Sequence, residues 1–191
     1  MEIKKTYYDL PPLETKRLLL RKLTLDDAND MFEYACEPDI TKYVPWEYHK
    51  SIEDTLTFLR TVMKKYEENI GADWGIVLKE SNKLIGTIGV RLSPENARAE
   101  IGYALSKNYW NKGITIEAMN EIIRFGFNKM DLNRIEARAQ VKNVASQRVM
   151  IKAGMTYEGT IREESFAKGE YHDFMLFSIL RKEYFERNQE S

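Results

Sequence analysis

The stretch from Glu100 to Met119 holds the residues whose types and spacing are most suited to chemistry. An apolar strand is followed by a short loop with Asn111 and Gly113, and then by a helical pattern. Such a turn leaves backbone N–H groups unpaired at the positive end of a helix dipole, a geometry that suits a phosphate or diphosphate. Glycine lets the backbone approach an anion closely, and Lys112 adds a positive charge. The spacing alone nevertheless favours a turn that binds only water.

The elements that must position this loop are indicated by changes in the hydrophobic period. Alternation predicts strands at residues 17–23, 74–78, 84–91, 98–105, 134–141, 156–161 and 173–180. Apolar stripes predict helices at residues 28–35, 52–66, 116–130 and 143–153. The order β-α-α-β-β-β-α-β-α-β-β predicts a mixed α/β domain whose central antiparallel meander leads into a βαβ-like second half.

The composition limits the partners that the chain can have. Its 191 residues include 29 Lys and Arg against 30 Asp and Glu, so the formal net charge is −1. Proteins whose main task is to bind nucleic acid or anionic membranes favour a basic excess. We therefore expect no direct nucleic-acid partner and no membrane partner, while a local site for a small anion stays open.

The sequence shows no sign of a metal centre, an internal disulfide or an export signal. Cys36 is the single cysteine, and His49 and His172 lie far apart without metal-ligand spacing. Residues 1–13 are charged and interrupted by two prolines, which does not suit a signal peptide, and no apolar run approaches about 20 residues. We expect one soluble domain over residues 1–191, located in the cytoplasm and without a metal.

Several short motifs follow one another along the chain from Thr15 onward. They are Thr15-Lys-Arg-Leu-Leu-Leu-Arg21, Ala99-Glu-Ile-Gly-Tyr103, Tyr109-Trp-Asn-Lys-Gly113, Glu117-Ala118, Asn143-x-x-Ser146, Ala153-Gly-Met-x-Tyr-Glu-Gly159 and Gly169-Glu-Tyr-His-Asp173. Through them the chain resembles the GNAT superfamily of acyl-CoA-dependent N-acyltransferases, and within it the ribosomal-protein alanine N-acetyltransferases (the Rim branch). The resemblance implies a mostly antiparallel mixed sheet of about seven strands, splayed between the fourth and fifth, with helices on both faces.

The resemblance also implies acetyl-CoA as the cofactor, with coenzyme A as product. The diphosphate-binding loop of the superfamily corresponds here to residues 110–115, in which only Gly113 matches the pattern strictly. Trp110 replaces a polar residue, as is common in the Rim branch, and Thr115 replaces a smaller one. The residues expected to contact the diphosphate are Asn111, Lys112, Gly113, Ile114 and Thr115.

The pantetheine arm of the cofactor would lie in the splay between the fourth and fifth strands. By resemblance, the backbone of Tyr103, Ala104 and Leu105 pairs with the arm as with an added strand, and one N–H polarises the thioester carbonyl. Asn143 would hold a pantetheine amide, and Ser146 would lie near the sulfur.

A carboxylate is the expected base that removes the amine proton. Glu100 is the first choice, because its strand position resembles that of the usual glutamate of the superfamily. A strand glutamate paired with Arg98 or Arg138 is the alternative interpretation. Some Rim-type enzymes instead place a glutamate where Ser165 stands here, just after residues 163–164, both glutamates.

The leaving thiolate needs a proton, and the superfamily often supplies it from a tyrosine on the short helix. Met150 occupies that place here and cannot donate. Ser146 is the nearest substitute, as in the Rim branch, although a serine that bonds back to its own helix is an equally open interpretation.

Acceptor recognition is expected in the irregular segment 37–50, where Trp46 and Tyr48 lie between two helices, together with Tyr171. A Trp46 that merely covers the core is the alternative. The implied reaction is direct attack of a protein N-terminal α-amine on acetyl-CoA. A small-amine acetyltransferase (aminoglycoside or polyamine type) and a non-catalytic acyl-CoA-binding module stay open, as do the monomer and the homodimer.

Overall fold

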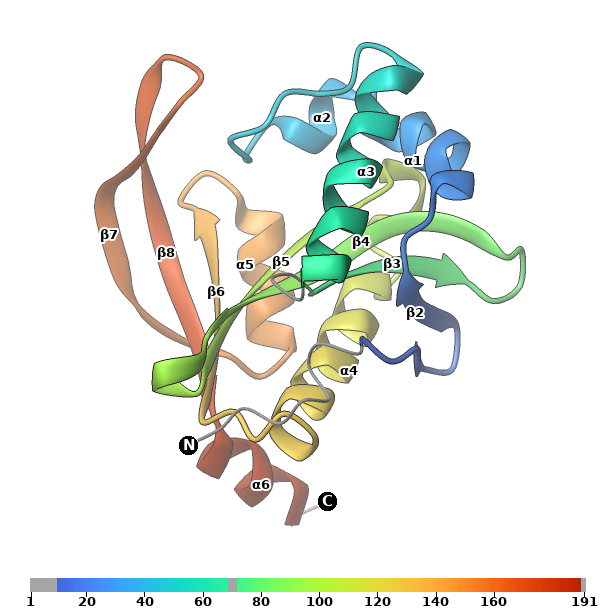
Figure 1. Ribbon diagram of the computed structural model, residues 1–191. Helices are drawn as coiled ribbons and strands as arrows, with labels where there is room; N and C mark the ends of the chain where they lie inside the picture. The colour runs from blue at the N-terminus through green and yellow to red at the C-terminus, as the bar shows by residue number, and fades with distance from the viewer. Residues whose placement is uncertain (1–9, 69–71, 190–191) are drawn as a thin grey trace.

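The computed structural model describes residues 10–68 and 72–189 of the chain. Most of the charged stretch 1–13, on which the expectation about a signal peptide rests, lies outside the described residues. Within them, eight strands form one sheet with the order β1-β2-β3-β4-β5-β6-β8-β7 (Figure 1). They are β1 (Leu13–Glu14), β2 (Leu18–Lys22), β3 (Ala72–Leu78), β4 (Lys83–Ser93), β5 (Arg98–Leu105), β6 (Arg134–Gln140), β7 (Thr156–Ala167) and β8 (Glu170–Leu180).

The helices cover both faces of this sheet. They are α1 (Ala28–Ala35), α2 (Pro38–Thr41), α3 (Ile52–Glu68), α4 (Ile114–Asn128), α5 (Val144–Lys152) and α6 (Arg181–Gln189), with the short 3₁₀ turns η2 (Leu25–Asp27), η3 (Pro94–Asn96) and η4 (Lys107–Tyr109). None of the helices in the described part of the chain combines the length and apolarity that a membrane crossing requires.

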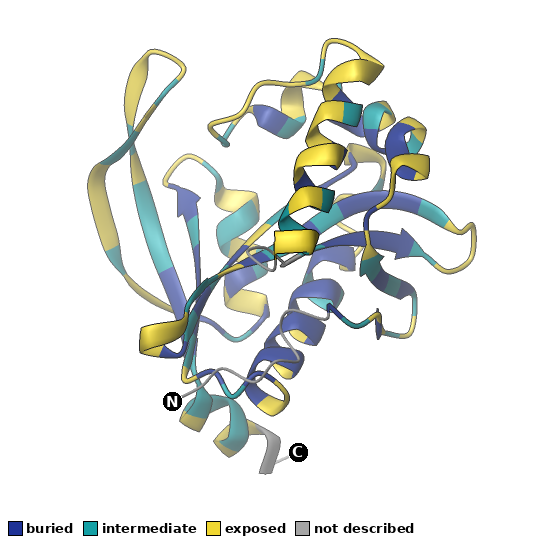
Figure 2. Cartoon of the chain, in the orientation of Figure 1, coloured by how far each residue is buried: buried dark blue, intermediate teal, exposed yellow. Residues whose placement is uncertain are grey.

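Alternation along the central strands divides the apolar residues between two cores. On one face, Met31 of α1 and Leu59 of α3 belong to the same buried cluster as Val77 of β3. On the other face, Met119 of α4 belongs to a larger cluster with Ile76, the neighbour of Val77. Figure 2 shows this arrangement, with buried residues along α4 and a largely exposed outer side on α3. The predicted mixed α/β fold is confirmed.

The sheet opens between β5 and β6. These two strands are parallel, and their pairing runs only from Arg98↔Arg134 to Ile101↔Ala137. Beyond that point β5 stays paired with β4 as far as Leu105, and β6 stays paired with β8. Each strand therefore follows its other neighbour, which is the splay that the family resemblance predicted.

Several elements differ from the sequence-based expectation. The sheet has eight strands rather than about seven, because the two residues of β1 pair with β2. β7 and β8 are longer than the strands predicted at residues 156–161 and 173–180 and pair as a hairpin. Most β7 residues are exposed and show no apolar alternation, so the pattern did not indicate the added length. The sequence also gave no sign of α2, which has four residues, or of α6, whose sequence RKEYFERNQ lacks an apolar stripe.

Candidate functional site

The loop before α4 has the geometry of an anion-binding turn. Asn111 and Gly113 both adopt left-handed backbone conformations, with φ of 60° and 73°. Gly113 is the N-cap residue, and no side chain caps the first turn of α4. Since the first N–H groups of a helix have no partner inside the helix, these groups are available to a ligand. Thr115 is buried, so its side chain packs into the protein rather than onto the surface of the loop.

The end of β5 is fixed to this loop by side-chain bonds. The indole N–H of Trp110 donates to the carbonyl of Leu105 at 2.8 Å. The ammonium of Lys112 lies 5.4 Å from the centre of the Tyr109 ring. Trp110 therefore connects the backbone expected to bind pantetheine with the loop expected to bind diphosphate, a role that the motif alone did not indicate.

A pair of hydroxyl groups connects the opened end of β5 with the start of α5. Tyr103 Oη and Ser146 Oγ are 2.6 Å apart, and Tyr103 Oη also donates to the Ser146 carbonyl at 3.3 Å. Asn143 caps α5 by accepting the Ser146 N–H at 3.2 Å. Burial raises the pKa of Tyr103 to about 12, although its bond to Ser146 lowers it. The hydroxyl of Ser146 is therefore bonded to Tyr103, a side chain whose role the sequence did not indicate.

Glu100 lies on the face of the sheet opposite α4, among arginines. Its carboxylate pairs with Arg91 at 2.8 Å and with Arg138 at 3.7 Å. Arg98, the other predicted partner, pairs instead with the buried Glu136 at 3.7 Å. These contacts place the Glu100 carboxylate between two arginines, beside the point where β5 and β6 separate.

A second carboxylate, Glu164, shares Arg138 with Glu100. Glu164 Oε1 accepts from Arg138 Nη1 at 2.9 Å. Its other oxygen, Oε2, is buried and has no hydrogen-bond partner within the described residues. The register between β7 and β8 shifts between Ile161 and Ser165, and this irregularity surrounds Glu164. The glutamate found in some Rim-type enzymes at the position of Ser165 was the signal that pointed to this neighbourhood.

The expected acceptor residues lie on two separate segments. Trp46 is 37% exposed and has its ring 6.1 Å from that of His49, so it does not simply cover the core. Tyr48 is 36% exposed in the same loop. Tyr171 is 63% exposed near the tip of the β7–β8 hairpin, where its ring lies 5.0 Å from that of Phe166.

One contact joins these two segments. Lys168, at the tip of the hairpin, donates from its ammonium to the carbonyl of Thr41 at 2.6 Å. Thr41 is the last residue of α2, just before the loop with Trp46 and Tyr48. The Lys168 side chain therefore connects the hairpin tip with α2, and Figure 1 shows both at the same end of the molecule.

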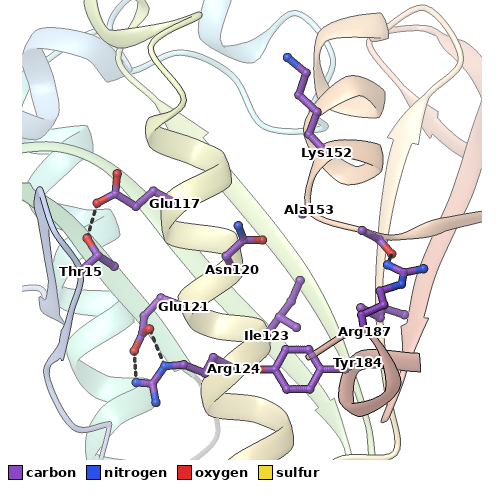
Figure 3. Close-up of a pocket in the computed structure, with 12 residues that line it drawn as sticks. Thr15, Glu117, Asn120, Glu121, Ile123, Arg124, Lys152, Ala153, Tyr184 and Arg187 are labelled. Atoms are coloured by element: carbon purple, nitrogen blue, oxygen red, sulfur yellow. Dashed lines mark hydrogen bonds and ion pairs between the residues drawn. The ribbon is translucent and has the colours of Figure 1, made fainter. Parts of the chain in front are cut away.

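A cavity of about 540 Å³ lies on the face of the sheet that α4 covers, between α4, the end of α5 and α6. Glu117 and Asn120 of α4 line it on one side, and Lys152 and Arg187 line it on the other (Figure 3). Glu117 lies four residues after Gly113, so the cavity begins next to the anion-binding turn. Within the described ranges, no group of three or more His, Cys, Asp or Glu side chains is arranged to hold a metal ion.

Comparisons with known sequences identify the family of the chain. The profile of the acetyltransferase (GNAT) domain matches residues 17–156. The uncharacterized N-acetyltransferase p20 of Bacillus licheniformis is 35% identical over 173 residues, which cover 90% of this chain and 97% of the relative. The ribosomal-protein-serine acetyltransferase of Escherichia coli is 31% identical over 104 residues, which cover 54% of this chain and 58% of the relative.

Solved structures agree with these matches. An acetyltransferase of the GNAT family from Bacillus anthracis has a TM-score of 0.82 and 31% identity, covering 90% of this chain and 99% of that one. A ribosomal L7/L12 α-N-protein acetyltransferase, solved in complex with coenzyme A, has the same fold with a TM-score of 0.80 at 19% identity, covering 89% and 98%. Since the domain profile spans most of the chain, the chain belongs to the GNAT acetyltransferase family and is an N-acetyltransferase.

Proposed function

We propose that residues 1–191 form one domain that transfers an acetyl group from acetyl-CoA to the N-terminal α-amine of a protein, by direct attack of the amine on the thioester. The observation that carries the proposal is the opening between β5 and β6 beyond Ile101 and Ala137, next to the left-handed turn at Gly113. Bare amides at that turn and unpaired strand edges in the opening fit the two halves of coenzyme A.

The residues proposed to hold the cofactor come from three elements. The N–H groups of the loop from Asn111 to Thr115, together with Lys112, would bind the diphosphate. The backbone of residues 103–105 would pair with the pantetheine arm, and the Asn143 amide would bind one of its polar groups. Bound acetyl-CoA supplies an acetyl thioester, the group that a neutral amine attacks.

Glu100 is the proposed base, and Glu164 is the second candidate. Either carboxylate would take the amine proton, directly or through a water molecule. Arg138 contacts both of them, so it would hold the base in position and stabilise its charge before the proton arrives. Glu164 is a candidate because one of its oxygens is buried without a partner among the described residues.

Ser146 is proposed to donate its hydroxyl proton to the departing thiolate, and the proton that the carboxylate base took from the amine, returned through water, would restore the Ser146 hydroxyl. The single Tyr103 proton can go to Ser146 Oγ, at 2.6 Å, instead of to the Ser146 carbonyl, at 3.3 Å; in that arrangement the Ser146 proton is free to point toward the sulfur. An alkyl thiol has a pKa near 8.5, so its thiolate is a fairly stable leaving group and a weak donor suffices.

The acceptor is proposed to be a protein N-terminus of the ribosomal-protein type, bound between the loop with Trp46 and Tyr48 and the hairpin with Tyr171. The name of the Escherichia coli relative supports this class of acceptor. The charges also support a protein N-terminus over a polycation as the acceptor. Several glutamates on the face of the sheet opposite α4 are each paired with an arginine; these glutamates are Glu100, Glu136, Glu158 and Glu164. A site for a polycation would need carboxylates that are not neutralised in this way.

The test is thiol release from acetyl-CoA with a panel of acceptors. We expect turnover with peptides that begin with Ala or Ser and have a free N-terminus, and none with the same peptides blocked at the N-terminus. An α-amine of pKa near 8 is partly neutral at pH 7.5, whereas a lysine amine near 10.4 is not. Turnover only with polyamines or aminoglycosides would replace the proposed acceptor, and tight cofactor binding without turnover would remove the catalytic role.

A further inference from the structure

The first turn of α4 is connected to the N-terminal part of the chain through Glu117. The Glu117 carboxylate accepts from the Thr15 hydroxyl at 2.6 Å, from the Arg17 backbone N–H at 2.9 Å and from Arg17 Nε at 2.6 Å. Figure 3 shows the Thr15–Glu117 bond at the edge of the cavity beside α4. These three bonds, from residues about 100 positions away, occupy most of the roughly four acceptor sites of the Glu117 carboxylate.

The same arginine also contacts the anion-binding turn. Arg17 Nη1 donates to the carbonyl of Lys112 at 2.9 Å. Arg17 Nη2 is the nearest atom to the position that a Cβ on Gly113 would take, at 3.6 Å. One planar guanidinium therefore fixes the turn and the first turn of the helix relative to each other.

Without its bonds to Arg17, the Glu117 carboxylate would repel an anion bound at this turn. Burial on its own raises the pKa of Glu117, but the hydrogen bonds from Thr15 and Arg17 outweigh burial and hold the pKa below its usual value. The carboxylate is therefore negatively charged at neutral pH, one helical turn from the proposed diphosphate. Arg17 neutralises that charge and leaves Lys112 and the free amides to attract the ligand.

We propose that Arg17 is a positioning residue for the diphosphate loop, acting through its bonds to Glu117 and to the Lys112 carbonyl, and that it makes the enzyme favour a nucleotide-bearing thioester over a short one. The inference rests on the proposed function, in which residues 110–115 hold the diphosphate of coenzyme A. Arg17 lies in the bend between β1 and β2, 95 residues before Lys112 in the sequence, so the preference depends on a contact across the fold.

Substitution of Glu117 separates this role from simple electrostatics. If charge alone mattered, Glu117→Gln would remove a negative group near the diphosphate and tighten coenzyme A binding. If the pair positions the loop, the same change releases Arg17 and weakens binding. Arg17→Gln weakens binding under both views, so the direction of the Glu117→Gln effect is the informative result.

The experiment uses the full chain and two readouts. Calorimetry measures the Kd of coenzyme A, and initial rates compare acetyl-CoA with S-acetylpantetheine, which ends before the diphosphate. We expect Arg17→Gln and Glu117→Gln each to raise the Kd about 10-fold, since each loses charge-assisted hydrogen bonds. The kcat/KM for S-acetylpantetheine should stay within about twofold of that of the unaltered enzyme, and the double variant should be no worse than either single one.

Arg21→Gln is the matched control. Arg21 lies on β2, four residues after Arg17 in the sequence, and forms a comparable two-bond pair with Asp27 of η2. It should lower stability without changing the ratio of rates for the two thioesters. Equal losses with both thioesters, or tighter coenzyme A binding by Glu117→Gln, would overturn the inference while leaving the proposed function in place. No binding of coenzyme A by the unaltered chain would overturn the proposed function and the inference with it.

Discussion

At the scale of residues, the chemistry depends on two glutamates that share one arginine. Glu100 pairs with Arg91 and Arg138, whereas Glu164 pairs with Arg138 and keeps one buried oxygen without a partner among the described residues. The base must accept a proton from the amine during the reaction. Glu164 has an oxygen that could accept it, so Glu164 is an alternative to Glu100, the base that the family resemblance favours.

The pH dependence of two variants distinguishes these carboxylates. If Glu100 is the base, Glu100→Gln should lower kcat/KM by about 100-fold at pH 7 and by much less at pH 9.5, where the amine is already neutral. Glu164→Gln should then give a small loss that does not depend on pH. An equal loss at both pH values for Glu100→Gln, with a pH-dependent loss for Glu164→Gln, would assign the role to Glu164.

The hydroxyl pair gives a second prediction for single residues. Because burial raises the pKa of Tyr103 to about 12, its phenol stays protonated and able to donate across the working pH range. Tyr103→Phe should therefore lower kcat about 3- to 10-fold, the value of one hydrogen bond, without changing the shape of the pH profile.

Ser146→Ala should cost more than Tyr103→Phe, and the double variant should resemble Ser146→Ala, because Tyr103 acts through the serine. Steady-state rates over pH 6–9 check both expectations. Losses that simply add would show that the two hydroxyls work independently.

At the scale of elements, the opened end of β5 depends on its close contact with β4. A Cβ on Gly86 would lie against the carbonyl oxygen of Ala104 and 3.1 Å from Leu105 Cα, both of which are backbone atoms of β5. Gly86 is therefore the residue that lets β5 follow β4 as it leaves β6.

Gly86→Ala should push this segment of β5 outward. We expect a loss of about 1–3 kcal/mol in the free energy of unfolding, as for other overpacked sites, together with weaker coenzyme A binding. Gly159→Ala is the control, since a Cβ there would meet nothing within 4 Å. Urea denaturation measures the stability of both variants, and calorimetry measures their affinity for coenzyme A. Unchanged coenzyme A binding by Gly86→Ala would show that the path of β5 at residues 104–105 does not affect the cofactor site.

The elements also show what the sequence could and could not predict. The turn at Gly113 could be predicted because it is local: an apolar strand, a glycine and a helical pattern follow one another in the sequence. The left-handed conformation of Gly113 itself is seen only in the structure. The proximity of Glu164 to Glu100 was not, because it requires β7 to reach β6 through β8 with a shifted register. The bonds of Arg17 to Glu117 and of Tyr103 to Ser146 likewise join residues far apart in the sequence.

At the scale of the whole molecule, one buried tyrosine (Tyr34) and two partly buried ones (Tyr66 and Tyr103) link stability to alkaline pH. Burial raises the pKa values of Tyr34, Tyr66 and Tyr103 above their value of about 10 in the unfolded chain. Above pH 10 the unfolded state releases phenolic protons that the folded state retains, so folding stability decreases as the pH rises toward 12. Below pH 10 these tyrosines are protonated in both states, so they should not make the folding stability depend on pH.

Urea denaturation between pH 8 and pH 11 checks this expectation. Stability should be flat with respect to these groups up to about pH 10 and then fall. Tyr34→Phe should make the fall shallower, because one buried phenol no longer titrates in the unfolded state. A fall of the same steepness in this variant would mean that other groups cause the alkaline loss.

The account depends most directly on where coenzyme A binds, and a crystal structure of the chain with coenzyme A measures that. We predict the diphosphate on the backbone N–H groups around Gly113 and the pantetheine arm between residues 102–105 of β5 and 138–140 of β6. Coenzyme A bound only in the cavity beside α6, or a structure in which β5 and β6 stay paired past Ile101, would contradict the account.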